Sequence, residues 1–237
     1  YYPPALQRGA GVLFWLSTAC IFSLPFCLVA WLAPWYLYVL CAPFLLKACF
    51  AWRALEDHAR AVVDAVKDGL DAGREKVQLL VSRNTADLDE DHILSAAYES
   101  ASENLTDSIV SPLLFFAVFG LFGAALYRAA NTMDAMLGYR DERERLGWCS
   151  ARMDDMFNFI PARITTLFLL LYFAAHGRLY KAWAILQRDG KNRPGFNGGI
   201  VMAAMAGGIG IQFEKPGVYT IGDPERSLAE GGSDIIR

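Results

Sequence analysis

The stretch from Gly9 to Ala33, GAGVLFWLSTACIFSLPFCLVAWLA, contains no charged side chain. At about 1.5 Å per residue, a helix of this length crosses the roughly 30 Å of hydrocarbon in a bilayer. Pro25 lies inside the stretch, and a membrane helix tolerates proline when neighbouring groups satisfy the freed backbone. The stretch therefore predicts a membrane-spanning helix and decides the fold class.

Three further apolar segments follow at about 34–50, 109–130 and 160–176. The first of these is short and contains Pro43, so it either crosses with help from flanking tryptophans or returns part-way. Together with 9–33, these segments predict an all-α fold. We expect a polytopic integral membrane protein with amphipathic and cytoplasmic helices between the apolar segments.

The polar segments, 51–108 and 131–159, are the expected catalytic parts of a single membrane domain that comprises residues 1–237. The small, glycine-rich run 195–210 suits a packed helix or loop, and the tail 216–237 is expected to be flexible. Many of the Lys and Arg residues lie in segments that can share one side of the membrane. That side should be cytoplasmic, which predicts a multi-pass protein of the cell membrane with its active side inside.

Composition and motifs argue against several classes of function. The net charge of −3 gives no basic character for nucleic acid, and the five cysteines form no zinc-like spacing. The chain has no GxxxxGK[ST] motif, and its serines have no visible His–Asp partners, so neither a Walker-type site nor a catalytic triad is predicted. A channel or transporter is disfavoured because the charges lie between the apolar segments and not inside them.

An acidic face precedes the third apolar segment. Glu99, Glu103 and Asp107 are spaced i, i+4, i+8, and no Lys or Arg occurs between Arg83 and Arg128. Like charges at this spacing repel, so relief must come from Mg²⁺, from a substrate amine, or from arginines of another segment. The three carboxylates are therefore candidate metal ligands, with Asn104 nearby. The alternative is a solvated acidic face.

The second polar segment supplies complementary groups. Arginine binds carboxylate or phosphate through a bidentate fork, and Asp and Asn at i, i+3 spacing suit phosphate and metal chemistry. The alternative is juxtamembrane positive charge with helix caps. The candidate residues are Asn131, Asp134, Tyr139, Arg143, Arg152, Asp155, Asn158 and Arg163.

The two polar segments can form one site only under a topological condition. If 109–130 crosses the membrane fully, the acidic face and the Arg152 segment lie on opposite sides. Gly120 and Gly123 lie in the middle of this apolar segment. We therefore predict that Gly120–Gly123 makes a re-entrant bend, or that the segment lies shallow in the membrane.

Several motifs resemble one family in an ordered series that covers about half of the chain. They are VSRNTA (81–86), ESASENLTDS (99–108), YRAANTMDAMLGYRDER (127–143), GWCSARMDDMFNFIPARIT (147–165) and AAMAGGIGI (203–211). This series resembles the CobD/CbiB membrane proteins, the adenosylcobinamide-phosphate synthases of late cobalamin biosynthesis.

The resemblance implies that ATP, with Mg²⁺, drives amide-bond formation between a corrinoid substrate, adenosylcobyric acid, and aminopropanol phosphate or a similar amino-alcohol. The lipid bilayer, further copies of the chain, or other late cobalamin-pathway membrane enzymes are the implied partners. The implied catalytic residues are Asp134, Arg152, Asp155 and Arg163. The implied substrate- or phosphate-binding residues are Arg83, Asn104, Asn131, Tyr139, Arg143, Asn158 and Asn197.

Three departures from the family pattern bear on activity. The N-terminus looks shortened, Ser82-Arg83-Asn84-Thr85 replaces Gly-Arg-Asp-Thr, and Met202 stands where a glutamate is typical. Related AmpE-like membrane proteins supply an alternative to catalysis. That alternative is a membrane sensor or scaffold that binds a corrinoid or a partner protein without turnover.

Overall fold

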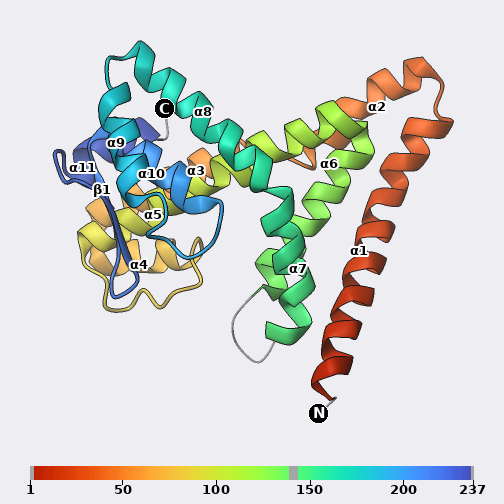
Figure 1. Cartoon of the computed structure of the whole chain (residues 1–237), viewed down its shortest axis with the longest axis horizontal. Helices are drawn as coiled ribbons and strands as arrows, with labels where there is room; N and C mark the ends of the chain where they lie inside the picture. Colours follow the sequence, from red (N-terminus) through yellow and green to blue (C-terminus); the bar gives the residue numbers. More distant parts are fainter. Residues whose placement is uncertain (1–2, 139–143, 236–237) are drawn as a thin grey trace. The chain divides into compact units, whose positions relative to one another are not determined.

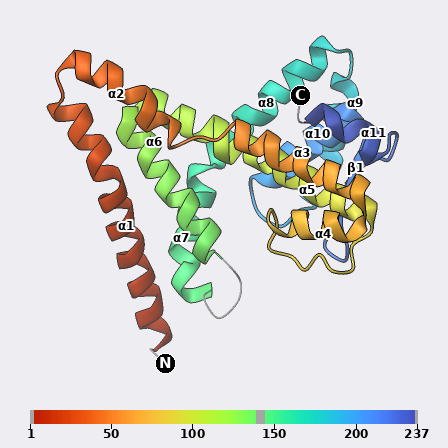
Figure 2. The same cartoon turned by 180° about the vertical axis from the view of Figure 1, so that it is seen from behind.

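The computed structural model describes residues 3–138 and 144–235, and Figures 1 and 2 show it from opposite sides. The helices are α1 (Pro4–Leu32), α2 (Trp35–Lys47), α3 (Arg53–Asp68), α4 (Leu70–Gln78), α5 (Glu90–Leu105), η1 (Thr106–Val110), α6 (Ser111–Leu137), α7 (Glu144–Phe157), α8 (Phe159–Ala175), α9 (Leu179–Asp189), α10 (Gly198–Ile209), α11 (Leu228–Gly231) and η2 (Gly232–Ile235). Each predicted apolar segment is helical, which confirms the helical membrane fold.

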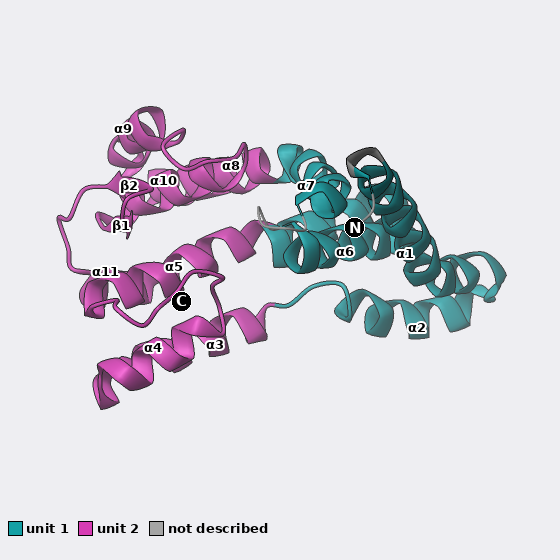
Figure 3. Ribbon diagram, turned by 90° about the horizontal axis from the view of Figure 1, so that it is seen from below, with its two compact units in different colours: residues 1–51, 107–161 teal, residues 52–106, 162–237 magenta. Residues whose placement is uncertain are grey.

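The chain forms two compact units, coloured separately in Figure 3. Unit 1 comprises residues 1–51 and 107–161, and unit 2 comprises residues 52–106 and 162–237. Each unit is built from two separate stretches of chain, so neither corresponds to one continuous piece of sequence. The prediction of a single membrane domain stays a prediction.

In unit 1, α1 packs against α6 and α7. Gly11 makes the close approach to α7 because a Cβ there would lie 2.2 Å from the carbonyl oxygen of Leu146. Further along α1, Trp15 and Ala19 are buried against Ala130 and Met133 of α6. The small residue at position 11 therefore sets the spacing between α1 and α7, as small residues do at membrane helix interfaces.

Large apolar side chains remain exposed on the outer faces of unit 1, including Leu13, Ile21, Trp31 and Phe44. Such an apolar surface is typical of contact with lipid. Two helical stretches of the described residues, Leu6–Leu32 and Glu90–Leu137, are long and apolar enough to cross a bilayer. The pair α7 and α8, bent by 42°, makes a third if it is taken as one span.

The third apolar segment bends back on itself within α6 (Figures 1 and 2). Gly120 has φ 64° and ψ −155°, which interrupts the helix. A Cβ on Gly123 would lie 2.3 Å from the carbonyl oxygen of Phe115, so the second limb returns close to the first. This geometry confirms a bend at Gly120–Gly123, whereas a re-entrant or shallow position of the segment in the membrane stays a prediction.

Unit 2 is arranged around α5, which contacts α3, α4, α10 and β1. One core cluster joins Tyr98 of α5 to Met202 of α10 and to Phe213 of the β-strands, and all three are fully buried. Gly208 lies against the ring of Phe173 in α8, which brings these two helices close together. The glycine-rich run is thus a packed helix, as its sequence predicted.

The C-terminal segment differs from its sequence prediction. Strands β1 (Gln212–Lys215) and β2 (Tyr219–Gly222) pair antiparallel, with Phe213 opposite Ile221 and Lys215 opposite Tyr219. The tail that was expected to be flexible continues through α11 and η2 and packs on α5. Ile221 and Leu228 are buried in the core of unit 2, which explains why this tail is ordered.

Candidate functional site

Asn158 is the centre of a buried polar network in unit 1. Its Oδ1 accepts hydrogen bonds from Ser111 Oγ at 2.7 Å and from Tyr127 Oη at 2.8 Å. Its Nδ2 donates to Asp154 Oδ2 at 3.0 Å. Ser111 begins the first limb of α6 and Tyr127 lies on the second, so one amide ties both limbs to the end of α7.

Asp154 extends this network because its Oδ1 also accepts from Asn131 Nδ2 at 3.2 Å. The sequence prediction selected the neighbouring Asp155, whose carboxylate instead lies 3.7 Å from Arg152 in a half-exposed pair. Asp154 is therefore a functional candidate that sequence reasoning missed. Its position four residues before Asn158 was the available signal, since i, i+4 residues share a helix face.

Four further predicted residues belong to the segments around α6 and α7. Asp134 lies one turn after Asn131, close to Gly138, and is partly buried. Asp107 lies in the π-helical turn η1 and belongs to unit 1. Tyr139 and Arg143 lie outside the described residues.

In unit 2, the carboxylate of Glu99 is buried and accepts hydrogen bonds from three side chains. Arg83 Nη2 donates to Glu99 Oε2 at 3.0 Å, and Tyr219 Oη donates to the same oxygen at 2.7 Å. Ser95 Oγ donates to Glu99 Oε1 at 2.6 Å. Burial and the nearby charge of Glu99 raise the pKa of Tyr219, so its phenol stays a donor.

Glu103, one turn further along α5, forms an ion pair with Arg193 from the loop before α10. Glu99 and Glu103 are thus each paired with an arginine from outside α5, and arginine pairing is one of the three sources of relief that the sequence left open. The solvated-face alternative is wrong for Glu99, which is 5% exposed.

The predicted metal site is not supported by this arrangement. Three donors already occupy the oxygens of Glu99, and an arginine occupies Glu103. The described residues contain no group of three or more His, Cys, Asp or Glu side chains that could hold a metal ion. The residues present at Glu99 and Glu103 therefore do not fit Mg²⁺.

Two other predicted residues of unit 2 do meet. Arg163 Nη1 donates to Asn197 Oδ1 at 2.9 Å, which links α8 to the residue that precedes α10. Asn104 Nδ2 donates to the carbonyl oxygen of Ser100 on its own helix, at 2.9 Å. Met202 is fully buried in the core of unit 2 and is a packing residue in this chain.

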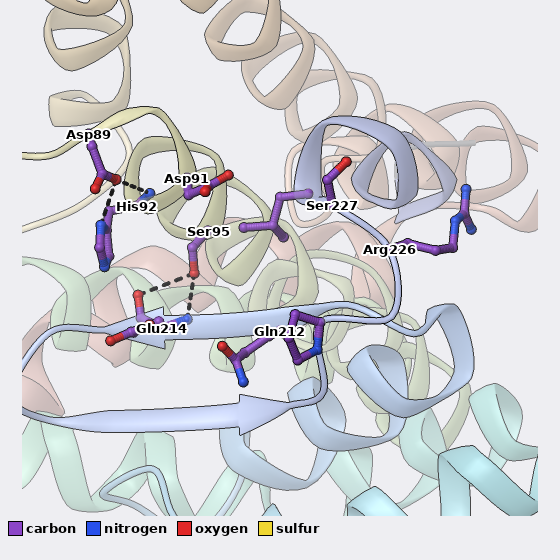
Figure 4. Close-up of a pocket in the computed structure, with 10 residues that line it drawn as sticks. Asp89, Asp91, His92, Ser95, Gln212, Glu214, Arg226 and Ser227 are labelled. Carbon is purple, nitrogen blue, oxygen red and sulfur yellow. Dashed lines mark hydrogen bonds and ion pairs between the residues drawn. The ribbon is translucent and has the colours of Figure 1, made fainter.

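Two pockets flank the Ser95–Glu99 pair. The larger, of about 420 Å³, is lined by Asp89, His92, Ser95 and Glu214 among others (Figure 4). Ser95 Oγ accepts from the backbone N–H of Glu214 at 2.8 Å, which fixes β1 on α5. Hydrogen bonds from the backbone and side chain of His92 hold the pKa of Asp89 below its usual value.

The smaller pocket, of about 180 Å³, is lined by residues of the 80–83 loop, α5, the loop before α10 and the β-strands. It contains the predicted residues Arg83, Glu99 and Glu103. It also contains Arg193, Lys215 and Tyr219, which sequence reasoning missed. No local spacing could have indicated them, because they join α5 from positions about 90 to 120 residues away in sequence.

Comparisons with known proteins identify the family of this chain. The model of the CobD/Cbib protein family matches residues 3–235. The probable cobalamin biosynthesis protein CobD of Methanothermobacter thermautotrophicus is 40% identical over 220 residues, which cover 92% of this chain and 74% of that protein. The protein of the same description from Thermococcus kodakarensis is 45% identical over 217 residues, 91% of this chain and 70% of that protein. No solved structure matches. The chain belongs to the CobD/Cbib family.

Proposed function

We propose that this chain acts in cobalamin biosynthesis as a membrane-bound amide ligase. It would join a propionate carboxyl of adenosylcobyric acid to aminopropanol phosphate, or a similar amino-alcohol, to give adenosylcobinamide phosphate. The observation that carries this proposal is the family match over residues 3–235, together with relatives described as probable cobalamin biosynthesis proteins.

The proposed reaction has two steps. The carboxylate attacks the terminal phosphorus of ATP, which gives an acyl phosphate and ADP. The amine then attacks the acyl carbon, loses a proton to a base, and expels inorganic phosphate as the amide forms. Mg²⁺ would enter with the nucleotide and screen the phosphate charge during transfer.

The described residues offer groups for each step. Arg152 and Arg163 supply guanidinium groups for phosphate charge, and a positioned cation is most effective where charge develops in the transition state. Asp155 is half-exposed beside Arg152, and Asp134 is partly buried on α6. Either carboxylate is a candidate base for the proton of the attacking amine.

We also propose that the chain crosses the cell membrane more than once, with its polar segments on the cytoplasmic side, where ATP is available. The apolar helices of unit 1 support membrane insertion. Further copies of the chain or other late-pathway membrane enzymes are the proposed partners. The net charge of −3 gives no support for a nucleic-acid partner.

The test is a turnover assay on the full chain in lipid nanodiscs with adenosylcobyric acid, aminopropanol phosphate, ATP and Mg²⁺. Mass spectrometry should detect adenosylcobinamide phosphate, and ADP release should require both the corrinoid and the amine. A folded chain that binds the corrinoid but never consumes ATP would instead support the sensor or scaffold.

Asp155→Asn tests the assigned base. The variant should lose product formation while its melting temperature stays near that of the wild type. Glu144→Gln, an exposed acid on the same helix, is the matched control and should keep full activity. Full activity in Asp155→Asn would remove Asp155 from the proposed mechanism.

A further inference from the structure

The small pocket of unit 2 has an excess of positive charge. Three cationic groups, Arg83, Arg193 and Lys215, line it together with two carboxylates, Glu99 and Glu103. Each carboxylate is paired with one arginine. The side chain of Lys215 has no ion pair or hydrogen bond within the described part of the chain, so one positive charge remains without a counterion.

Arg83 has unused hydrogen-bonding capacity as well. Its Nη2 binds Glu99, but its Nη1 is buried and has no hydrogen-bond partner among residues 3–138 and 144–235. A buried guanidinium donor without an acceptor destabilises the folded protein. An acceptor supplied by a ligand would remove this destabilisation.

The β-strands hold Lys215 at the pocket. The turn Pro216–Gly217 follows it, and Gly217 adopts φ 71°, a left-handed conformation that favours glycine. The backbone N–H of Val218 donates to the carbonyl of Lys215 at 2.9 Å and closes the turn. Tyr219, directly opposite Lys215 in the strand register, anchors this end to Glu99.

We propose that this pocket binds the phosphate group of a small phosphate monoester, with Lys215 and Arg193 as its main contacts and Arg83 behind them. The excess positive charge and the guanidinium forks match a phosphate dianion. The proposal deepens the proposed function, because such a ligand would be its amino-alcohol phosphate.

The volume of the pocket favours a small molecule over a nucleotide. Drug-sized ligands occupy pockets of roughly 300–1,000 Å³, and this pocket measures about 180 Å³. A phosphate with a two- or three-carbon chain fits that space, whereas ATP would have to extend outside it. The two sources of phosphate are therefore separable by experiment.

The experiment measures binding to the full chain in nanodiscs by isothermal titration calorimetry. The probes are inorganic phosphate, O-phosphoethanolamine and AMP, each without corrinoid or Mg²⁺. Phosphoethanolamine should bind at least as tightly as phosphate, and both should bind more tightly than AMP. Tighter binding of AMP would show that the pocket serves a nucleotide and would overturn the assignment to a small monoester.

Substitutions that remove or keep single positive charges test which residues bind the phosphate group. Lys215→Gln and Arg193→Gln should each weaken phosphoethanolamine binding about tenfold or more, the size expected for one charge-assisted contact. Lys191→Gln removes the same charge from an exposed position in the loop that contains Arg193 and should leave binding unchanged. Lys215→Arg keeps the charge and should retain most of the affinity, which controls for folding.

Equal affinity in the wild type and in both charge-removing variants would overturn the proposal. Its failure is distinguishable from failure of the proposed function. Phosphate binding that depends on Lys215, without any amide product, would contradict the proposed ligase activity and support the phosphate-binding pocket. Product formation that is unaffected by Lys215→Gln and Arg193→Gln would support the ligase activity and show that its phosphate site lies elsewhere.

Discussion

The rings of Phe115 and Tyr127 lie with their centroids 5.2 Å apart, although twelve residues separate them in α6. In a straight helix, twelve residues span about 18 Å along the axis. The break at Gly120 therefore folds the helix back and brings the two ends of an apolar segment together. This return allows Ser111 and Tyr127 to reach the same oxygen of Asn158.

The hairpin in α6 should depend on the backbone of Gly120. Its φ of 64° with ψ of −155° is a conformation that is essentially restricted to glycine. Gly120→Ala should cost about 1–3 kcal/mol and lower the melting temperature in detergent by several degrees. The cause is backbone strain and not crowding, because nothing lies within 4 Å of an added Cβ.

Gly9→Ala is the matched control for Gly120→Ala. Gly9 also has open space around an added Cβ, but it lies in a regular part of α1. Alanine favours a helix over glycine by about 1 kcal/mol, so this variant should be neutral or more stable. Equal melting temperatures for both variants would contradict a strained hairpin at Gly120.

The same hairpin predicts membrane topology. Because α6 returns on itself, the chain before Ser111 and the chain after Tyr127 should face the same side of the membrane. Single cysteines at Asp91 and Glu144, in a background without the five native cysteines, should be labelled by a membrane-impermeant maleimide from the same side. Both positions are exposed, and labelling from opposite sides would show that α6 crosses.

Much of the fold could be predicted because apolar length and glycine position are local properties of the sequence. The segment 9–33 predicts α1, and Gly120 with Gly123 predicts the bend. The partners of Glu99 and Glu103 could not be found this way. Arg193 is 90 residues from Glu103, and Tyr219 is 120 residues from Glu99, so only the tertiary packing of α5 brings them together.

The order of the C-terminal tail and the role of Asp154 in the Asn158 network were also missed because they depend on tertiary packing. The tail looked flexible because its strand β2 is only four residues long and much of the segment is polar. Its order comes from Ile221 and Leu228, which are buried in the core of unit 2. Asp154 was missed because adjacent helical positions face about 100° apart and spacing alone did not select it, whereas the role of Asp155 stays a prediction.

The acceptor role of Asn158 can be measured by a double-mutant cycle. Asn158→Leu keeps the branched shape of the side chain but leaves two buried hydroxyl donors without their acceptor, which should cost about 2–4 kcal/mol in total. Tyr127→Phe in the wild type removes one hydrogen bond and should cost about 1 kcal/mol. In the Asn158→Leu background, Tyr127→Phe should cost nothing or restore stability, because it deletes an unpaired hydroxyl.

Denaturant or thermal unfolding of the four proteins gives the coupling between Asn158 and Tyr127. Contacting residues typically show coupling of about 0.5–3 kcal/mol. Tyr38→Phe, on α2, is a control because none of the hydrogen bonds to Asn158 involves it. Additive effects of Asn158→Leu and Tyr127→Phe would show that the 2.8 Å hydrogen bond does not contribute to stability.

Acid sensitivity should arise in part from Asp189 at the end of α9. Burial alone would raise the pKa of Asp189, but donors outweigh this effect and hold the pKa below its usual value of 3.8. Arg188 donates to both carboxylate oxygens at 2.8 and 2.7 Å, and the backbone N–H of Gly222 donates at 2.8 Å. The ionised carboxylate therefore ties α9 to the end of β2.

A lowered pKa in the folded state contributes stability at pH values above the unfolded pKa of about 4, and this contribution disappears as the pH falls through the lower folded pKa. Asp189→Asn should thus lower the melting temperature at pH 7 by several degrees, and this difference should shrink steadily below pH 4. Asp223→Asn is the control, since Asp223 pairs with the same Arg188 but is half-exposed and should contribute little. A difference between wild type and Asp189→Asn that is the same at pH 3 as at pH 7 would show that the charge of Asp189 is not what stabilises this junction.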